Sequence, residues 1–118
     1  MKRTNKRKGF TLVEIMIVVL IIGILLAIAV PNFITARRNS RASTIIANLE
    51  QVDAGKEQCA MDEGLTVGDN CGNMGNYIKD YATMTWPVSG VFAEAAIGTA
   101  PTFRGKTADQ WRADKSGL

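Results

Sequence analysis

The chain has 118 residues, no histidine and a formal net charge of +3 at pH 7. Its length allows at most one small domain, and the lack of histidine removes the commonest general base and the commonest metal ligand. The sequence also contains neither a Gly-x-Ser-x-Gly motif nor a glycine-rich phosphate-binding loop. We therefore expect a protein that is not an enzyme.

The positive charge is concentrated at the N-terminus. Five of the first nine residues are Lys or Arg, whereas from Phe10 onward nine Lys or Arg face eleven Asp or Glu, a balance of −2. The basic character thus belongs to a tail and not to a folded surface of the kind that binds nucleic acid. No specific nucleic-acid partner is expected.

Residues 10–34 form the apolar segment of the chain. The stretch Phe10–Val30 holds 21 residues, and its only charge is Glu14. As a helix it would be about 31 Å long, close to the roughly 30 Å thickness of a bilayer's hydrocarbon core. Five Lys or Arg precede this stretch and three arginines follow it, which favours a cytoplasmic N-terminus and an exported head.

Three interpretations of this N-terminal region compete. A secretory signal would be cut after Ala29, but its apolar core is usually only about 7–15 residues long. A plain uncleaved anchor gains nothing from Glu14, since a carboxylate in the bilayer costs about 2.5–3.5 kcal/mol near the centre and less near an end. Cleavage before Phe10 would instead create an amine that can pair with Glu14 of the same chain or of a neighbour. A Glu14 that simply reaches interfacial water is the simpler alternative.

The run Lys8-Gly9-Phe10-Thr11-Leu12-Val13-Glu14, followed by aliphatic residues, resembles the prepilin cleavage and methylation motif of type IV pilins and type II secretion pseudopilins. The resemblance covers roughly residues 1–55. It implies that a prepilin peptidase cuts between Gly9 and Phe10 and methylates the new amine of Phe10. It also implies that Glu14 pairs with that amine during assembly of a helical filament of identical subunits. An inner-membrane assembly platform and its ATPase would then be further partners.

Pro31 and the residues after it continue the predicted helix. Pro31 matches the proline at which helices of this family bend or locally melt, and a proline inside a helix also lacks a backbone donor and crowds the preceding turn. Beyond it, apolar residues recur at three- and four-residue steps until Gly64, a typical stop; they are Ala42, Ile45, Ile46, Leu49, Val52 and Cys59. We expect this stripe to pack against the head. The opposite, solvated face is expected to carry Arg41, Asn48, Glu50, Gln51, Lys56 and Glu57. A free amphipathic helix on the membrane surface is the alternative.

Three arginines, Arg37, Arg38 and Arg41, follow the apolar segment. Such a cluster could contact DNA, but no aromatic residues are interleaved with it. We expect these side chains to be solvated or to face lipid headgroups.

The chain has two cysteines, Cys59 and Cys71. In an exported segment such a pair predicts a disulfide, here closing the loop 60–70 with a stabilisation of about 3 kcal/mol by chain-entropy estimates. The alternative is that Cys59 is simply a buried member of the stripe. A metal site made from two thiols without histidine is not expected.

The head is predicted from short local patterns. Residues 73–83 suggest a short helix capped by Asn73 or Asn76, and residues 90–98 with 99–104 suggest a two-stranded hairpin that must lie against the long helix. Residues 106–118 look like a polar tail with a helical turn around 109–113. Major pseudopilins often hold calcium in C-terminal loops, but here Asp109 and Asp114 are the only late carboxylates. Calcium prefers six to eight oxygen ligands, so no cofactor is expected.

Together these patterns predict an α+β, pilin-like fold, in which one long bent helix of about fifty residues packs against a small head with a short helix and a few-stranded antiparallel sheet. The expected segments are a leader (1–9), a transmembrane and filament-core helix (10–34), its amphipathic continuation (35–63) and the head with its tail (64–118).

The expected function is that of a structural subunit of a type IV pilus-like or type II secretion pseudopilus filament. It would first span the bacterial inner membrane once and then join a periplasmic or cell-surface filament. The rival is a monomeric membrane-anchored envelope protein whose head binds a partner. The sequence leaves open the kind of filament, a DNA-uptake fibre included, and whether the subunit is major or minor.

Overall fold

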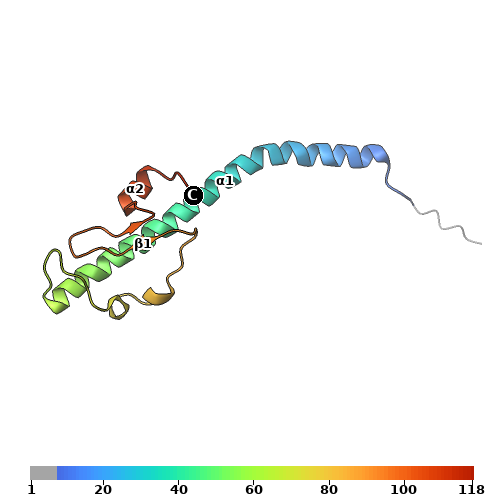
Figure 1. The fold of residues 1–118 in the computed structure, drawn as a ribbon. Coiled ribbons are helices and arrows are strands. Elements are labelled where there is room, and N and C mark those ends of the chain that lie inside the picture. Colours follow the sequence, from blue (N-terminus) through green and yellow to red (C-terminus); the bar gives the residue numbers. More distant parts are fainter. Residues whose placement is uncertain (1–7) are drawn as a thin grey trace, which may run out of the picture. The chain divides into compact units, whose positions relative to one another are not determined.

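A computed structural model of the protein describes residues 8–118 (Figure 1). The helix α1 (Leu12–Glu63) is followed by two 3-10 helices, η1 (Met74–Asn76) and η2 (Tyr81–Thr83), by the strands β1 (Phe92–Ala93) and β2 (Thr102–Phe103), and by the helix α2 (Ala108–Ala113). One long N-terminal helix with a small α+β head confirms the predicted pilin-like fold. Residues 1–7, most of the predicted leader, lie outside the described residues.

The chain forms two compact units, and their boundary falls inside α1. One unit runs through Ala36, and the other is Arg37–Leu118. In the first unit every described side chain is exposed. In the second unit α1 buries one face, as the stripe predicts; its buried residues are Ala42, Ile45, Leu49, Val52, Gly55, Lys56 and Cys59. The latter part of α1 is therefore part of the head's core and not a free helix.

Pro31 lies inside α1, and the helix continues through it. A proline has no N–H, so the carbonyl of Ala27 lacks its usual helical donor. The hydroxyl of Thr35 donates to the Pro31 carbonyl at 3.1 Å, within the next turn. The chain therefore passes the proline without the break that the sequence allowed for, and the bend stays a prediction.

The head packs two apolar clusters along its part of α1. The first joins Ile45 and Leu49 to Phe103 and Trp111, and the second joins Val52 to Met74 and Ile78. Phe92 borders both clusters, so β1 connects them, whereas Phe103 of β2 belongs to the first. Aromatic side chains thus provide much of the core in a head with few regular elements.

The segment after residue 106 was predicted to be a polar tail, and this is wrong for its central residue. Trp111 is only 1% exposed, and its indole N–H donates to the Phe103 carbonyl at 3.1 Å. The turn predicted at 109–113 is the helix α2, which begins in a capping box between Thr107 and Gln110. The cap positions α2 so that Trp111 enters the first cluster.

The other head elements are shorter than predicted. The single helix expected at 73–83 is instead the pair η1 and η2. They are separated by residues 77–80, the last of which, Asp80, has a left-handed conformation (φ 61°). Asn73 precedes η1 but its side chain makes no capping hydrogen bond. The hairpin is present, with Phe92 opposite Phe103 and Ala93 opposite Thr102. Each strand has only two residues, because residues 94–101 leave the sheet.

Candidate processing and assembly site

The predicted cleavage junction lies in accessible, non-helical chain. Gly9 and Phe10 precede α1, and the Phe10 side chain is 85% exposed. A Cβ atom built on Gly9 would meet no other group within 4 Å. The residues at which a peptidase would act are therefore unobstructed by the rest of the described chain.

Thr11 and Glu14 define the start of α1. The Thr11 side chain accepts a hydrogen bond from the Glu14 backbone N–H at 3.3 Å, which is the bond of an N-cap. The helix therefore begins at Leu12, two residues later than the segment 10–34 implies. Glu14 lies exposed in the first turn, where its negative charge is favourable to the helix dipole. Thr11-x-x-Glu14 is a capping-box pattern that could have located this start.

The first half of α1 presents an uninterrupted apolar surface. From Leu12 to Ile34 the large aliphatic and aromatic side chains are all exposed, and α1 is long and apolar enough to cross a membrane. Nothing within the described chain covers this surface. Pro31 lies far along the same helix from Phe10 and Glu14, so the predicted assembly residues form a line along one segment and not a compact pocket.

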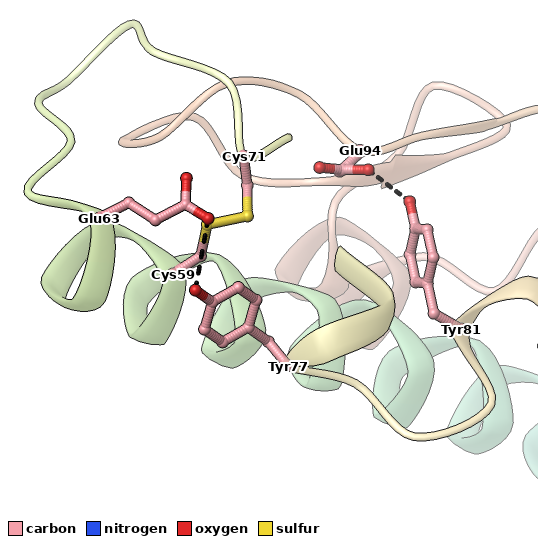
Figure 2. Close-up of a disulfide and its surroundings, with 6 residues drawn as sticks. All are labelled: Cys59, Glu63, Cys71, Tyr77, Tyr81 and Glu94. Atoms are coloured by element: carbon pink, nitrogen blue, oxygen red, sulfur yellow. Dashed lines mark hydrogen bonds between the residues drawn. A yellow bond between two sulfur atoms is a disulfide. The ribbon is translucent and has the colours of Figure 1, made fainter. Parts of the chain in front are cut away.

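The predicted cysteine pair is joined. Cys59, fully buried on α1, forms a disulfide with Cys71 across a separation of 12 residues (Figure 2). Beside it, the Tyr77 hydroxyl donates to Glu63 at 3.4 Å. Cys59, Glu63 and Cys71 lie close enough to suggest a metal site, but both sulfurs are already bonded to each other. The cluster therefore holds the end of α1 to the chain that follows it.

Lys56 was expected on the solvated face, and the structure contradicts this. The residue is 2% exposed, and its ammonium group donates to the carbonyls of Glu94, Ala96 and Thr99 at 3.2, 3.2 and 2.5 Å. The carboxylate of Asp53, one turn earlier on α1, lies 3.7 Å away. Buried charges persist when they are paired and fully hydrogen-bonded, so Lys56 fastens the loop 94–99 to α1.

This lysine also explains the short hairpin. The loop turns its carbonyls inward by placing Ala95 at φ 62° and Gly98 at φ 81°, conformations that an extended strand cannot contain. The loop is held on its other side by two backbone bonds with the disulfide-closed segment: Gly68 N–H to the Ile97 carbonyl at 3.0 Å, and Ile97 N–H to the Asp69 carbonyl at 2.9 Å. The lysine and the disulfide therefore support neighbouring parts of one structure.

Tyr81 adds a second link to the same loop. Its hydroxyl donates to the Glu94 carboxylate (Figure 2). Burial is the main cause that raises the pKa of Tyr81 to about 12, and the hydrogen bond and negative charge of Glu94 add to it. The phenol is therefore neutral and able to donate throughout the physiological range.

The two late carboxylates are bonded to cations of the chain itself. Asp109 pairs with Arg112 at 2.5 Å. Asp114 pairs with Lys106 at 2.6 Å and accepts from the backbone N–H and hydroxyl of Ser116. These bonds occupy Oδ1 of Asp109 and both carboxylate oxygens of Asp114.

Comparisons with known proteins agree with the motif. The family described as "Prokaryotic N-terminal methylation motif" matches residues 4–30. The type IV major pilin protein PilA of Myxococcus xanthus is 57% identical over 49 residues, which are 41% of this chain and 22% of that protein. The type IV major alpha-pilin of Moraxella bovis is 37% identical over 101 residues, 79% of this chain and 60% of the relative.

A secretion protein is similar as well. The type II secretion system core protein G of Escherichia coli is 31% identical over 62 residues, 52% of this chain and 43% of that protein. Each of these alignments covers less than two thirds of the relative's own length, and no solved structure matches the chain significantly. The methylation motif, the long apolar helix and these relatives support a type IV pilin-like protein.

Proposed function

We propose that this protein is a structural subunit of a type IV pilus-like or type II secretion pseudopilus filament. The observation that carries the proposal is the first half of α1, an exposed apolar surface with one carboxylate, Glu14, in its first turn. In a membrane the lipid covers this surface, and in a filament the same helices of other subunits do. The proposed role is structural and not enzymatic.

Processing would convert the anchor into an assembly element. A prepilin peptidase would cut between Gly9 and Phe10, remove the basic leader, and methylate the new Phe10 amine. The amine remains a cation, and Glu14 of a neighbouring subunit would be its partner. Moving an apolar helix from lipid to a helix bundle gains little hydrophobic free energy, so packing and this ion pair must set the axial register between subunits.

The location and machinery follow from this role. Before assembly the subunit would cross the inner membrane once, with its N-terminus in the cytoplasm and the head exported. The inner-membrane platform and its ATPase would then lift it into a periplasmic or surface filament. Pro31 would help the helix to adjust when it moves from lipid into the bundle, because one helical hydrogen bond is already missing there.

The test replaces Glu14 in the expressed full-length chain. We expect Glu14→Ala and Glu14→Gln to be processed normally, with an intact mass that begins at a methylated Phe10, but to yield no sheared filaments by electron microscopy. Glu57→Ala, which removes an exposed carboxylate from the latter part of α1, is the matched control and should assemble.

Three other outcomes would each identify a rival. If the unmodified chain formed no filaments and Glu14→Ala behaved in the same way, the protein would be a monomeric anchored envelope protein. A mature chain beginning at Val30 would indicate a secretory signal. A chain that keeps Met1 and stays dispersed would remove the proposal altogether.

A further inference from the structure

The fold adds a fourth cation to the arginines that follow the apolar span. Arg37 and Arg38 are exposed, and Arg41 is half-buried. The ammonium group of Lys115, 76 residues from Asn39 in sequence, donates to the Asn39 side-chain oxygen at 3.0 Å. Arg37, Arg38, Arg41 and Lys115 are called the basic collar below, because three of them lie on one short stretch of α1 and the fourth contacts that stretch through Asn39.

The cations of the collar are spread around the helix and do not lie on a single face. Successive residues of an α-helix point about 100° apart, so the three arginines spread over about 100° of the circumference. Asn39, where Lys115 is attached, lies a further 100° or so beyond Arg38. The cations thus cover more than half of the helix. A partner that docks on one side would need them on one side, whereas a layer of headgroups meets a membrane helix all the way round.

The charge of the collar is not compensated by the chain. No Asp or Glu occurs in the sequence between Glu14 and Glu50. Among residues 8–118 none of the three arginines forms a salt bridge. Asp114, the neighbour of Lys115, is bound to Lys106 and Ser116. Four cations therefore remain available to an external anion.

The collar also lies at the depth of a headgroup layer. A span of about 30 Å that ends at Ile34 begins at Ile15, just after Glu14; Arg37 follows its end by three residues, about 4.5 Å of helix, and Arg41 by seven, about 10 Å. The polar layer on each side of a bilayer is roughly 5–8 Å thick, and long cationic side chains bend toward it. Once the leader is removed, these four residues would be the main cations beside the span.

We propose that the basic collar binds the phosphodiester groups of anionic phospholipids at the C-terminal end of the apolar span. It would hold the processed subunit at a fixed depth in the membrane until the helix is withdrawn into a filament. This inference rests on the membrane-anchored state in the proposed function but not on processing or polymerisation.

The test uses the full-length chain in vesicles that carry spin-labelled phosphatidylglycerol or phosphatidylcholine. We expect the protein to associate preferentially with phosphatidylglycerol. Each cation near an anionic surface contributes up to about fivefold in association. Lys115→Gln should therefore lower the preference measurably, and neutralising all four residues should reduce it to what the five leader cations sustain. Raising the salt from 0.01 to 1 M should weaken the preference, since the Debye length falls from about 30 to about 3 Å.

Lys79→Gln is the matched control, because Lys79 is an exposed cation of the head outside the collar. It should leave the preference unchanged. The proposal is overturned if the fourfold variant prefers phosphatidylglycerol as strongly as the unmodified chain, or if Lys115→Gln behaves like Lys79→Gln. It is also overturned if the fourfold variant loses DNA binding or filament assembly while its lipid preference is intact, since the collar would then serve a nucleic acid or another subunit. Processing and filaments are measured separately, so failure of the proposed function does not obscure this result.

Discussion

The two parts of α1 share one secondary structure but differ in what surrounds them. Through Ala36 every described side chain is exposed and the surface is apolar, whereas beyond Arg37 one face is buried under the head and holds a disulfide and a buried lysine. In a bilayer a helix is favoured because it satisfies its own backbone groups. In the head the helix is held by side chains from distant parts of the sequence.

Because of this difference, folding of the head and assembly of the filament should depend on different parts of α1. Substitutions in the first part of α1 should change how subunits meet but leave the head folded. Substitutions in the latter part should unfold the head and leave the membrane helix in place. The head signal is the near-ultraviolet circular dichroism of Trp86 and Trp111, which pack around Phe103, and the helix signal is the far-ultraviolet spectrum.

Lys56→Met should have the largest effect on the head. The substitution keeps most of the side-chain volume but removes the ammonium group. The carbonyls of Glu94 and Thr99 then lose the donor that Lys56 supplies, whereas the Ala96 carbonyl keeps its bond from the Thr99 N–H. Each buried carbonyl left without a donor costs about 1–3 kcal/mol, so much of the stability of so small a head would be lost. In urea denaturation the head signal should disappear early while the helix signal of the membrane span persists.

The matched control for that substitution is Lys79→Met, which changes an exposed lysine and should leave the denaturation midpoint unchanged. Equal stability of the two variants would mean that Lys56 contributes nothing beyond its packing.

Lys56 also illustrates what sequence reasoning can and cannot recover. By spacing it belongs to the buried stripe, four residues after Val52 and three before Cys59. Its charge led to the prediction of a solvated position. The carbonyls that accept from its ammonium group come from residues 94–99, and no local sequence pattern predicts them. The regular features of the chain, namely the apolar segment, the stripe and the cysteine pair, were predictable because each is periodic or compositional.

Trp111 was missed for a different reason. The segment 106–118 is polar by composition, so one aromatic residue did not change the interpretation. The signals were nevertheless present: Thr107 and Gln110 stand at capping-box spacing, and a buried Trp needs a partner for its N–H. The two-residue strands could not have been predicted, since the loop between them is shaped by Lys56 and not by strand propensity.

Loss of the disulfide should be the next largest effect. Replacing Cys59 and Cys71 together by Ser should destabilise the head by about 3 kcal/mol, the chain-entropy value for a loop of this size. Reducing agent should do the same to the unmodified protein. The apolar span should be unaffected, because it contains no cysteine.

A single variant separates the bond from the packing of Cys59. Cys71→Ser leaves the Cys59 thiol buried on the stripe but removes the covalent link. If Cys71→Ser kept full stability, burial of Cys59 and not the disulfide would be what stabilises the head.

Two glycines in α1 provide a direct comparison of its two parts. A Cβ on Gly55 would lie 2.5 Å from Cγ1 of Ile78 and 3.3 Å from Cε of Met74, whereas a Cβ on Gly23 would meet nothing within 4 Å. We expect Gly55→Ala to destabilise the head by about 1–2 kcal/mol, because crowding in a packed core exceeds the gain of about 1 kcal/mol in helix propensity. Gly23→Ala should leave the head's denaturation midpoint unchanged. A Gly55→Ala head as stable as the unmodified one would show that the second cluster relaxes freely.

The smallest expected effect concerns Asp114, at the exposed edge of the head. The hydrogen bond from Lys106, followed by those from Ser116, lowers the pKa of this carboxyl to about 2, against about 3.9 in an unfolded chain. Because the folded state binds the proton less tightly, the carboxylate's contribution is fully present above about pH 4 and is lost as the pH falls toward 2.

Asp114→Asn should therefore remove part of the acid sensitivity of the head's thermal unfolding between about pH 4 and pH 2. Lys106→Met should have the same consequence, since it removes the other partner of the bond, and the two substitutions together should add little to either alone. The helix signal of the first part of α1 should not follow this transition, because Lys106 and Asp114 belong to the head. The part of α1 in the head will lose its helix signal with the head. If the whole helix signal disappeared with the head signal, the two parts of α1 would unfold as one, and the separation of folding from assembly would be wrong.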